Sequence, residues 1–387
     1  MTLHIIDKVN RKFLTYLTGE DCEACISLYM PLIKSGIEVR KNNIVFKDLY
    51  NRTKEKLTKY GIDIKNRANL LYPLDKLAED KEFWQNRPDG LAIFISPKQQ
   101  IIYRASTVFP VEAIVDKRFY IRPLLPLVQQ NKTVYLALVG QHNAQLVSII
   151  NHSCNRTLPS GQLRSLEAFL SHYDFEKSLQ HTGSRQAPHM HGQGAAGDKA
   201  NENRYLLEYY KSFRDWLHNQ LPNIKKLYLV GDDDNIGAFL KVSGDMSYKP
   251  IPIIHKNIQS LDDAALLKEA ESIMALQAEE EANRKFERFL QTRNNDPEKT
   301  LENSTEKILM AAHASQIETL FLPPEAEKIW GHFNSANQNI TLEEKPQEGV
   351  GEELLNLAAI RTLRSGGMVL VNNSGEITKN AAAICHW

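Results

Sequence analysis

Short apolar runs alternate with longer stretches of helical periodicity along most of the 387 residues. This alternation constrains the fold more than any other feature. The run Cys25–Leu32 is typical of a buried strand, and Val45, Leu49 and Leu57 share one face of a helix that ends at Gly61. Strands that alternate with helices pack in layers. The sequence therefore predicts an α/β architecture, and its length predicts two or three domains.

Breaks in this alternation divide the chain into three consecutive α/β domains. Two prolines in "IRPLLPLVQQ" (121–130) interrupt regular structure and place the first boundary near residue 128. Residues 129–256 form the central domain, with strands expected in "KTVYLALVG" and "KKLYLVG". A long helix with Ser260 as its expected N-cap opens the third domain, 257–387. There, Ser365-Gly366-Gly367 ends a helix and leads into a buried strand.

Composition narrows the classes of protein. The 47 basic side chains balance the 47 acidic ones, which argues against nucleic-acid binding by bulk charge but leaves room for local basic faces. No run approaches the roughly 18 apolar residues of a membrane span, and the first residues lack the apolar core of a signal peptide. We therefore expect a soluble, cytoplasmic protein with no membrane partner.

The central domain contains a stretch of unusual composition. Residues 180–200 are rich in Gly, His, Gln and Ala and have no hydrophobic period, so we expect a loop. Directly after it, apolar residues recur at helical spacing, at Tyr205, Leu206, Tyr209, Phe213, Trp216 and Leu217. A glycine-dense loop before a long helix is either a slack linker or a place where the backbone approaches another molecule closely.

The third domain resembles a known family. The segments "NSTEKILMAAHASQIETLFLP" (303–323), "GEELLNLAAIRTLRSGGMVLV" (351–371) and "AAAICHW" (381–387) follow one another as in the last domain of archaeal and eukaryotic peptide-release factors and Pelota. The first domain adds Phe83-Trp84 followed by "DGLAIF" (89–94). The whole chain resembles the bacterial branch of this superfamily. The resemblance implies a ribonuclease-H-like central domain and an L7Ae-like C-terminal domain.

The resemblance also implies a site. In release factors, a Gly-Gly-Gln loop of the central domain precedes a long helix and enters the peptidyl-transferase centre. Here His191-Gly192-Gln193-Gly194 stands at the corresponding place, with His191 in the position of the first glycine. These four residues are therefore the candidate catalytic residues for hydrolysis of the peptidyl-tRNA ester within the ribosome. A mobile surface loop with a chance Gly-Gln-Gly is the alternative.

Such a loop suits ester hydrolysis without a protein nucleophile. Glycines let a backbone N–H come close enough to stabilise the developing negative charge, and Gln193 could position water. His191 could accept a proton near neutral pH, although its side chain also fills space that the family loop leaves empty.

Two locally basic segments are candidates for contact with RNA phosphates. One lies in the first domain and the other on the helix beyond the loop. Their residues are Lys54 and Lys56, and Lys199, Arg204, Lys211 and Arg214. For any single lysine, the alternative is an ordinary solvated face.

Three further patterns have a structural reading that is stronger than a metal or redox reading. His181, His189 and His191 would need Asp198 to complete a tetrahedral zinc site, and a glycine-rich loop holds ligands poorly, so we expect solvent-exposed histidines. Cys22-x-x-Cys25 lacks the second pair of a zinc ribbon. Asp232–Asp234 follow a strand, where they could bind magnesium as in a nuclease, but we expect them to cap the next helix. We therefore expect neither a metal nor a cofactor.

These observations favour a translation factor that enters the ribosomal A site like a transfer RNA. Its task would be rescue of stalled ribosomes, protection of idle ones, or peptidyl-tRNA hydrolysis. Its partners would be the ribosomal and transfer RNA of that site, with a translational GTPase as a candidate partner. Stop-codon reading is not predicted, because Ile33-Lys34-Ser35 lies outside the context of the family's codon motif. The alternatives are an RNA- or protein-binding adaptor without a ribosomal role, and a magnesium-dependent nuclease.

Overall fold

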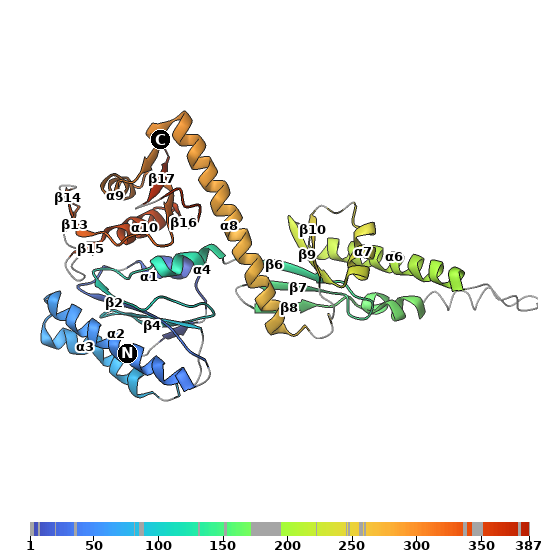
Figure 1. The fold of residues 1–387 in the computed structure, drawn as a ribbon, viewed down its shortest axis with the longest axis horizontal. Coiled ribbons are helices and arrows are strands. Elements are labelled where there is room, and N and C mark those ends of the chain that lie inside the picture. Colours follow the sequence, from blue (N-terminus) through green and yellow to red (C-terminus); the bar gives the residue numbers. More distant parts are fainter. Residues whose placement is uncertain are drawn as a thin grey trace, which may run out of the picture. The chain divides into compact units, whose positions relative to one another are not determined.

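The chain forms two compact units (Figure 1), unit 1 comprising Met1–Asn131 and Leu276–Trp387 and unit 2 comprising Lys132–Ala275. The computed structural model describes residues 4–6, 8–19, 21–34, 37–80, 82–84, 89–130, 132–150, 153–171, 195–221, 223–244, 246, 248–254, 258, 261–335, 339–342, 351–377 and 381–386. The side chains of residues 37, 195–202 and 254 lie outside this description.

The N-terminal part of unit 1 is built on a five-stranded sheet of order β1-β4-β3-β2-β5. The predicted strand is β2, Cys25–Pro31, which pairs antiparallel with both neighbours. Strands β3 and β4 form an antiparallel hairpin. The remaining strands of this sheet are β1 His4–Ile6, β3 Gly90–Ile95, β4 Gln100–Ala105 and β5 Glu112–Asp116.

Two helices, α2 (Lys41–Lys59) and α3 (Ile64–Glu79), cover one face of this sheet. The predicted helical face is confirmed, since Leu49 and Leu57 of α2 are fully buried in the core beneath the helices. Gly61 has φ +79°, a conformation that glycine adopts without strain, and this turns the chain from α2 into α3. Two short helices complete this part, α1 Arg11–Leu17 and η1 Ile37–Arg40.

The C-terminal part of unit 1 contains a four-stranded sheet of order β11-β17-β12-β16 and a three-stranded sheet of order β14-β13-β15. The helix-then-strand pattern expected here is confirmed, with Ser304 accepting the N-cap hydrogen bond of α9 and Gly366 at φ +91° ending α10. The elements are η5 Pro297–Lys299, β11 Thr300–Glu302, α9 Thr305–His313, β12 Ile317–Leu322, β13 Trp330–Asn334, β14 Asn339–Leu342, β15 Glu352–Glu353, α10 Leu354–Arg364, β16 Met368–Val371 and β17 Ala382–Cys385.

The two ends of the chain share one hydrophobic core. Tyr29 and Phe94 of the N-terminal sheet belong to the same cluster of buried side chains as Leu320 of β12 and Ile360 of α10. Burial of apolar surface is the main stabilising contribution to folding, so the N- and C-terminal parts stabilise each other.

The segment that joins this core to the central domain is helical. It consists of η2 (Arg122–Leu124) and α4 (Leu125–Gln130). The expectation that Pro123 and Pro126 break regular structure here is wrong. Both prolines lie in the first turn of their helices, where the missing N–H would have no helical partner.

Unit 2 is built on a five-stranded sheet of order β10-β9-β6-β7-β8. Strands β6, β7 and β8 form an antiparallel meander, whereas β6, β9 and β10 run parallel to one another. Two helices pack on one face of the sheet, and their side chains form a common core with it. The elements are β6 Val134–Leu138, β7 Gln145–Ile150, β8 Ser153–Thr157, η3 Gly161–Arg164, α6 Ala195–Gln220, β9 Lys226–Gly231, α7 Asp233–Val242 and β10 Lys249–Ile254.

The long helix α8 (Asp263–Asn295) belongs to both units. Its first half packs under the central sheet through Leu266 and Ile273, and its second half packs in unit 1 through Phe286 and Phe289. The two units divide inside this helix, between Ala275 and Leu276, and the division into three domains stays a prediction. Ser260 lies outside the described residues, and the side chain of Asp262 accepts the capping hydrogen bond from Ala265 N–H.

The α/β class is confirmed, because every sheet carries helices on at least one face. The ribonuclease-H-like and L7Ae-like assignments stay predictions. Within the described part of the chain, no helix is both long enough and apolar enough to cross a membrane.

Candidate functional site

The helix that follows the predicted loop is firmly fixed to the central sheet. Tyr209, Tyr210, Phe213 and Leu217 of α6 are fully buried in the core that α6 and α7 share with the sheet. The Tyr210 hydroxyl donates a 2.6 Å hydrogen bond to the side-chain oxygen of Asn235 at the start of α7. The predicted amphipathic helix is thus confirmed, and it packs through an aromatic face.

The candidate catalytic residues lie immediately before this helix in the sequence. His191, Gly192, Gln193 and Gly194 fall outside the described residues, as do the other two histidines of the metal reading, His181 and His189. The helix begins at Ala195, so the last six residues of the predicted loop, 195–200, are helical.

Two of the candidate RNA-binding residues on α6 are exposed. The side chain of Arg204 is 63% exposed, lies 3.9 Å from Glu208 and stacks over the ring of Tyr205 at 5.2 Å. Lys211 is exposed two turns further along. Lys199 is part of the helix, and its side chain lies outside the described residues. Arg204 and Lys211 therefore remain candidates for phosphate contact.

The other candidates differ in how far their charges are available. Arg214 is mostly buried and bound, because its guanidinium donates to the carbonyl of Val242 and pairs with Asp215. Lys54 is exposed on α2. Lys56 does not fit the predicted contact with RNA. Its side chain is buried, with 7% of the residue exposed, and its ammonium donates a hydrogen bond to the carbonyl of Ala113. A buried ammonium bound to the backbone is not presented to an RNA phosphate.

The acidic cluster after β9 has a structural role. Asp232 is the N-cap of α7, and its carboxylate accepts from both the backbone N–H and the side-chain amide of Asn235. Asp233 and Asp234 lie in the first turn of α7, where the helix dipole stabilises negative charge. The capping interpretation is confirmed. Among the described residues, no group of three or more His, Cys, Asp or Glu could hold a metal ion.

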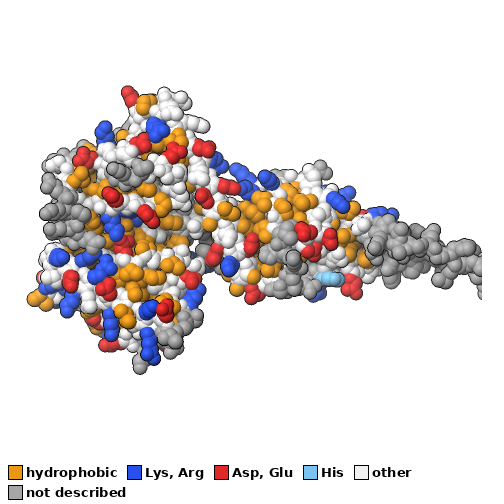
Figure 2. Space-filling model, viewed as in Figure 1, with side chains coloured by type: hydrophobic (Ala, Val, Ile, Leu, Met, Phe, Trp, Pro, Cys, Tyr) orange, Lys and Arg blue, Asp and Glu red, His pale blue; other side chains and the backbone are white. Residues whose placement is uncertain are grey.

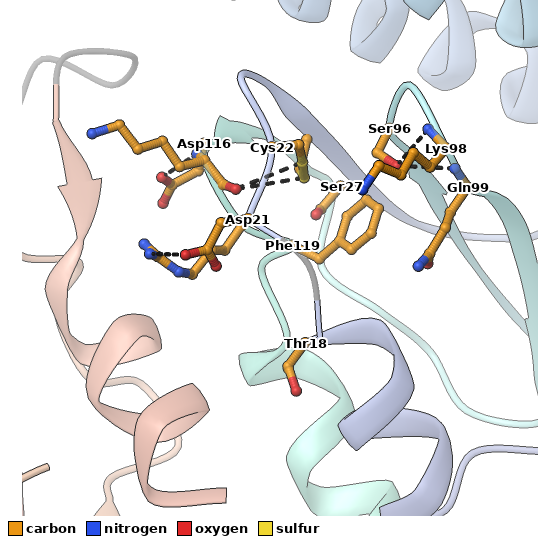
Figure 3. The surroundings of a disulfide bond; sticks show 12 residues. Thr18, Asp21, Cys22, Ser27, Ser96, Lys98, Gln99, Asp116 and Phe119 are labelled. Atoms are coloured by element: carbon orange, nitrogen blue, oxygen red, sulfur yellow. Dashed lines mark hydrogen bonds and ion pairs between the residues drawn. A yellow bond between two sulfur atoms is a disulfide. The ribbon is translucent and has the colours of Figure 1, made fainter. Parts of the chain in front are cut away.

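The cysteine pair of the first domain forms a disulfide (Figure 3). Cys22 and Cys25 have Cα atoms 6.1 Å apart, within the range that a disulfide requires. The carbonyl oxygen of Lys117 lies 3.6 Å from both sulfur atoms and accepts the Cys22 N–H at 2.9 Å. The prediction of a structural rather than zinc-binding pair agrees with this geometry, but the sequence did not predict the bond.

A charged network in unit 1 lies beside the disulfide and joins the two ends of the chain. Arg118 pairs with Glu352 at 2.5 Å and with Asp21 at 2.7 Å, and Asp21 also lies 3.3 Å from Arg364 of α10. Burial acts to raise the pKa of Asp21, but the hydrogen bonds and charges of Arg118 and Arg364 outweigh it and lower the pKa. Asp21 is thus held ionised as a link between the N- and C-terminal parts.

Asp116, labelled next to Asp21 in Figure 3, is a buried carboxyl group in the same network. Burial raises its pKa to about 7, and the charges of Glu352 and Glu353 act in the same direction. Backbone N–H groups of Glu353, at 3.0 Å, and Lys117, at 2.6 Å, donate to the carboxyl group and oppose the shift. No motif in the sequence marks this group, because Glu352 and Glu353 lie more than 200 residues away.

Charge on the described surface is mixed. On the face shown in Figure 2, acidic and basic side chains are interspersed over unit 1. This agrees with the zero formal net charge of the chain. Any contact with RNA must therefore rest on local clusters of cations rather than on the whole surface.

Comparison with solved structures finds similarity to factors of translation. The chain is similar to an archaeal translation termination factor, aRF1, with 14% identity, a TM-score of 0.24, and 98% of this chain and 99% of the other covered. It is similar to Archaeoglobus fulgidus Pelota, with 11% identity, a TM-score of 0.35, and 77% and 79% covered.

A third similar structure is Dom34 of S. cerevisiae, described as a termination-like factor of RNA quality control that interacts with Hbs1. Here the identity is 9%, the TM-score is 0.32, and 99% of this chain and 94% of the other are covered. No protein-family model and no curated protein matches the chain.

Proposed function

We propose that the protein is a ribosome-associated translation factor of the release-factor and Pelota type. It would act in the A site in rescue of stalled ribosomes, protection of idle ribosomes or hydrolysis of peptidyl-tRNA. The observation that carries the proposal is the position of Gly192-Gln193-Gly194 directly before the first residue of α6, in the unit that does not contain the chain ends.

The helix supplies what such a loop needs from its support. Its 26 residues span about 39 Å, and its aromatic face fixes the C-terminal half to the sheet. A segment attached to the first residue of this helix is thus carried by a rigid element. A rigid support holds functional groups in position better than a loop does.

The proposed partners are the ribosomal and transfer RNA around the A site. Arg204 and Lys211 lie on the exposed side of α6, 10 and 17 residues beyond Gly194, and Lys54 is exposed on unit 1. Such side chains contact phosphates without reading sequence. A translational GTPase is proposed as a further partner.

Co-sedimentation with ribosomes tests this proposal. The full chain should migrate with the ribosome peak on a sucrose gradient at low salt and less completely at moderate salt, because phosphate contacts weaken as salt rises. The double variant Arg204→Gln/Lys211→Gln should migrate with ribosomes less than wild type. The matched control Lys12→Gln/Lys307→Gln, which removes two exposed charges from unit 1, should resemble wild type. Wild-type protein that stays at the top of the gradient at both salt concentrations would favour the adaptor alternative.

A further inference from the structure

Basic side chains gather at the end of unit 2 where the parallel strands begin and α6 ends. Strands β6, β9 and β10 are parallel neighbours, so all three begin at the same edge of the sheet. Lys226 starts β9 next to Lys249, which starts β10 and is its register partner. Lys225 accepts a 2.9 Å backbone hydrogen bond from Lys249. Three lysines therefore come together at this edge.

The two helices of the same layer add their own cations. Arg214, in the last two turns of α6, donates a 2.7 Å hydrogen bond to the carbonyl of Val242 at the end of α7, next to Lys241. The Arg214 charge also acts on Tyr248, the residue before Lys249. Arg214 thus connects the helix ends to the strand starts, and the five cations form one cluster, the basic end: Arg214, Lys225, Lys226, Lys241 and Lys249.

Three of the five charges of the basic end are available to a ligand. Lys225, Lys241 and Lys249 are exposed, and among the described residues no acidic side chain forms an ion pair with any of the three. Asp215 pairs with Arg214 at 2.6 Å. The carboxylates of Asp232–Asp234 follow β9 and therefore lie at the opposite edge of the sheet. In the view of Figure 2, Lys and Arg side chains follow the upper border of unit 2.

We propose that the basic end of unit 2 binds the phosphate backbone of RNA. Neighbouring strands lie roughly 5 Å apart, so lysines on β9 and β10 present charges close enough to contact phosphates near one another on one RNA strand. Lysine ammonium groups on flexible stems suit such sequence-independent contact. The choice of RNA rather than another polyanion rests on the proposed function.

The basic end would extend the RNA contact that Arg204 and Lys211 provide on α6. Lys211 lies one helical turn before Arg214, so the exposed cations of α6 lead toward the basic end. Phosphate contacts along the length of one element fix the orientation of the unit on an RNA better than a single contact does.

Binding of a fluorescein-labelled RNA hairpin of mixed sequence, followed by anisotropy across a salt series, tests the proposal with the full chain. The triple variant Lys225→Gln/Lys241→Gln/Lys249→Gln should bind at least about 10-fold more weakly and lower the slope of log Kd against log salt by about 2 to 3. The corresponding triple Lys→Arg variant should bind like wild type. The control triple Lys12→Gln/Lys47→Gln/Lys307→Gln removes exposed charges from unit 1 and should keep the wild-type slope.

Other outcomes separate this proposal from the proposed function. An unchanged affinity and slope in the Gln triple, with the variant folded by circular dichroism, would overturn the RNA surface. Loss of binding only to phosphatidylglycerol–phosphatidylcholine vesicles would also overturn it and would indicate a membrane surface. Hairpin binding that depends on these lysines in a protein that does not sediment with ribosomes would support the basic end while contradicting the proposed function.

Discussion

The side chain of Asn356 accepts a 2.9 Å hydrogen bond from the backbone N–H of Ile121 and donates one of 3.1 Å to the carbonyl of Phe119. Asn356 lies in the first turn of α10 and is 1% exposed. Because these partners are 235 and 237 residues away, one buried amide joins the N-terminal part of unit 1 to the C-terminal part.

Replacing Asn356 by Ala should destabilise unit 1. The substitution leaves the Ile121 N–H and the Phe119 carbonyl without partners in a dry environment, which should lower the free energy of unfolding by roughly 2 to 4 kcal/mol. Hydrogen-exchange mass spectrometry should show faster exchange in peptides from α10 and from 117–124, with unit 2 peptides unchanged. Asn51→Ala, at an exposed position of α2, is the matched control and should leave all of these rates as in wild type.

Local periodicity predicted much of the fold. β2, α2, α6 and the alternation of α9, β12, α10 and β16 all carry their signals within a single run of residues. The shared core of unit 1 could not be predicted in this way, because only tertiary packing brings Tyr29 and Leu320 into one cluster of buried side chains. The division of α8 between two units escaped for a similar reason. The sequence of α8 shows one continuous helical pattern, and this pattern does not indicate that the two halves of the helix pack against different sheets.

The candidate site shows the same division. The helical period from Tyr205 onward predicted α6, whereas the predicted loop lies outside the described residues apart from 195–200, which are helical. The burial of Lys56 was not predictable, because its partner is the carbonyl of Ala113 on another element. The basic end was missed because its lysines are spread over β9, α7 and β10, and only the parallel register brings them together.

Asp116 should make the stability of unit 1 depend on pH. Its pKa is raised by burial from 3.8 to about 7 in the folded protein. The folded state therefore retains a proton that the unfolded chain loses, and the contribution is fully present below about pH 4 and lost as pH rises through about 7. Over this window the free energy of unfolding should fall by up to roughly 4 kcal/mol on account of this group.

Thermal unfolding from about pH 5 to about pH 8 measures this effect. Asp116→Asn should show a smaller decrease in Tm with rising pH than wild type, whereas Asp48→Asn, an exposed control on α2, should follow wild type. A pH profile of Asp116→Asn parallel to that of wild type would contradict the assignment.

The Cys22–Cys25 disulfide should stabilise unit 1 modestly. It closes a very short loop, so in the chain-entropy model its loss should lower the free energy of unfolding by about 2 kcal/mol. Wild type should therefore unfold at a lower temperature in a dithiol reductant, and Cys22→Ser should have the same Tm with and without it. Cys154→Ser, in unit 2, keeps the disulfide and should remain sensitive to the reductant. Alkylation of both Cys22 and Cys25 in the native, unreduced protein would show that the bond is absent.

Gln193 provides the sharpest test of a catalytic role. If the protein hydrolyses peptidyl-tRNA, Gln193→Ala should slow release of peptide from ribosomal complexes by about 100-fold or more, the loss expected when a group that stabilises the transition state is removed. Gln186→Ala, in the same stretch of sequence, is the matched control and should release peptide at the wild-type rate. Ribosome co-sedimentation of both variants separates chemistry from binding, because a positioning residue affects the rate more than the occupancy. Equal rates for Gln193→Ala and wild type would remove Gln193 from the mechanism, and no release by wild type would favour rescue or protection without hydrolysis.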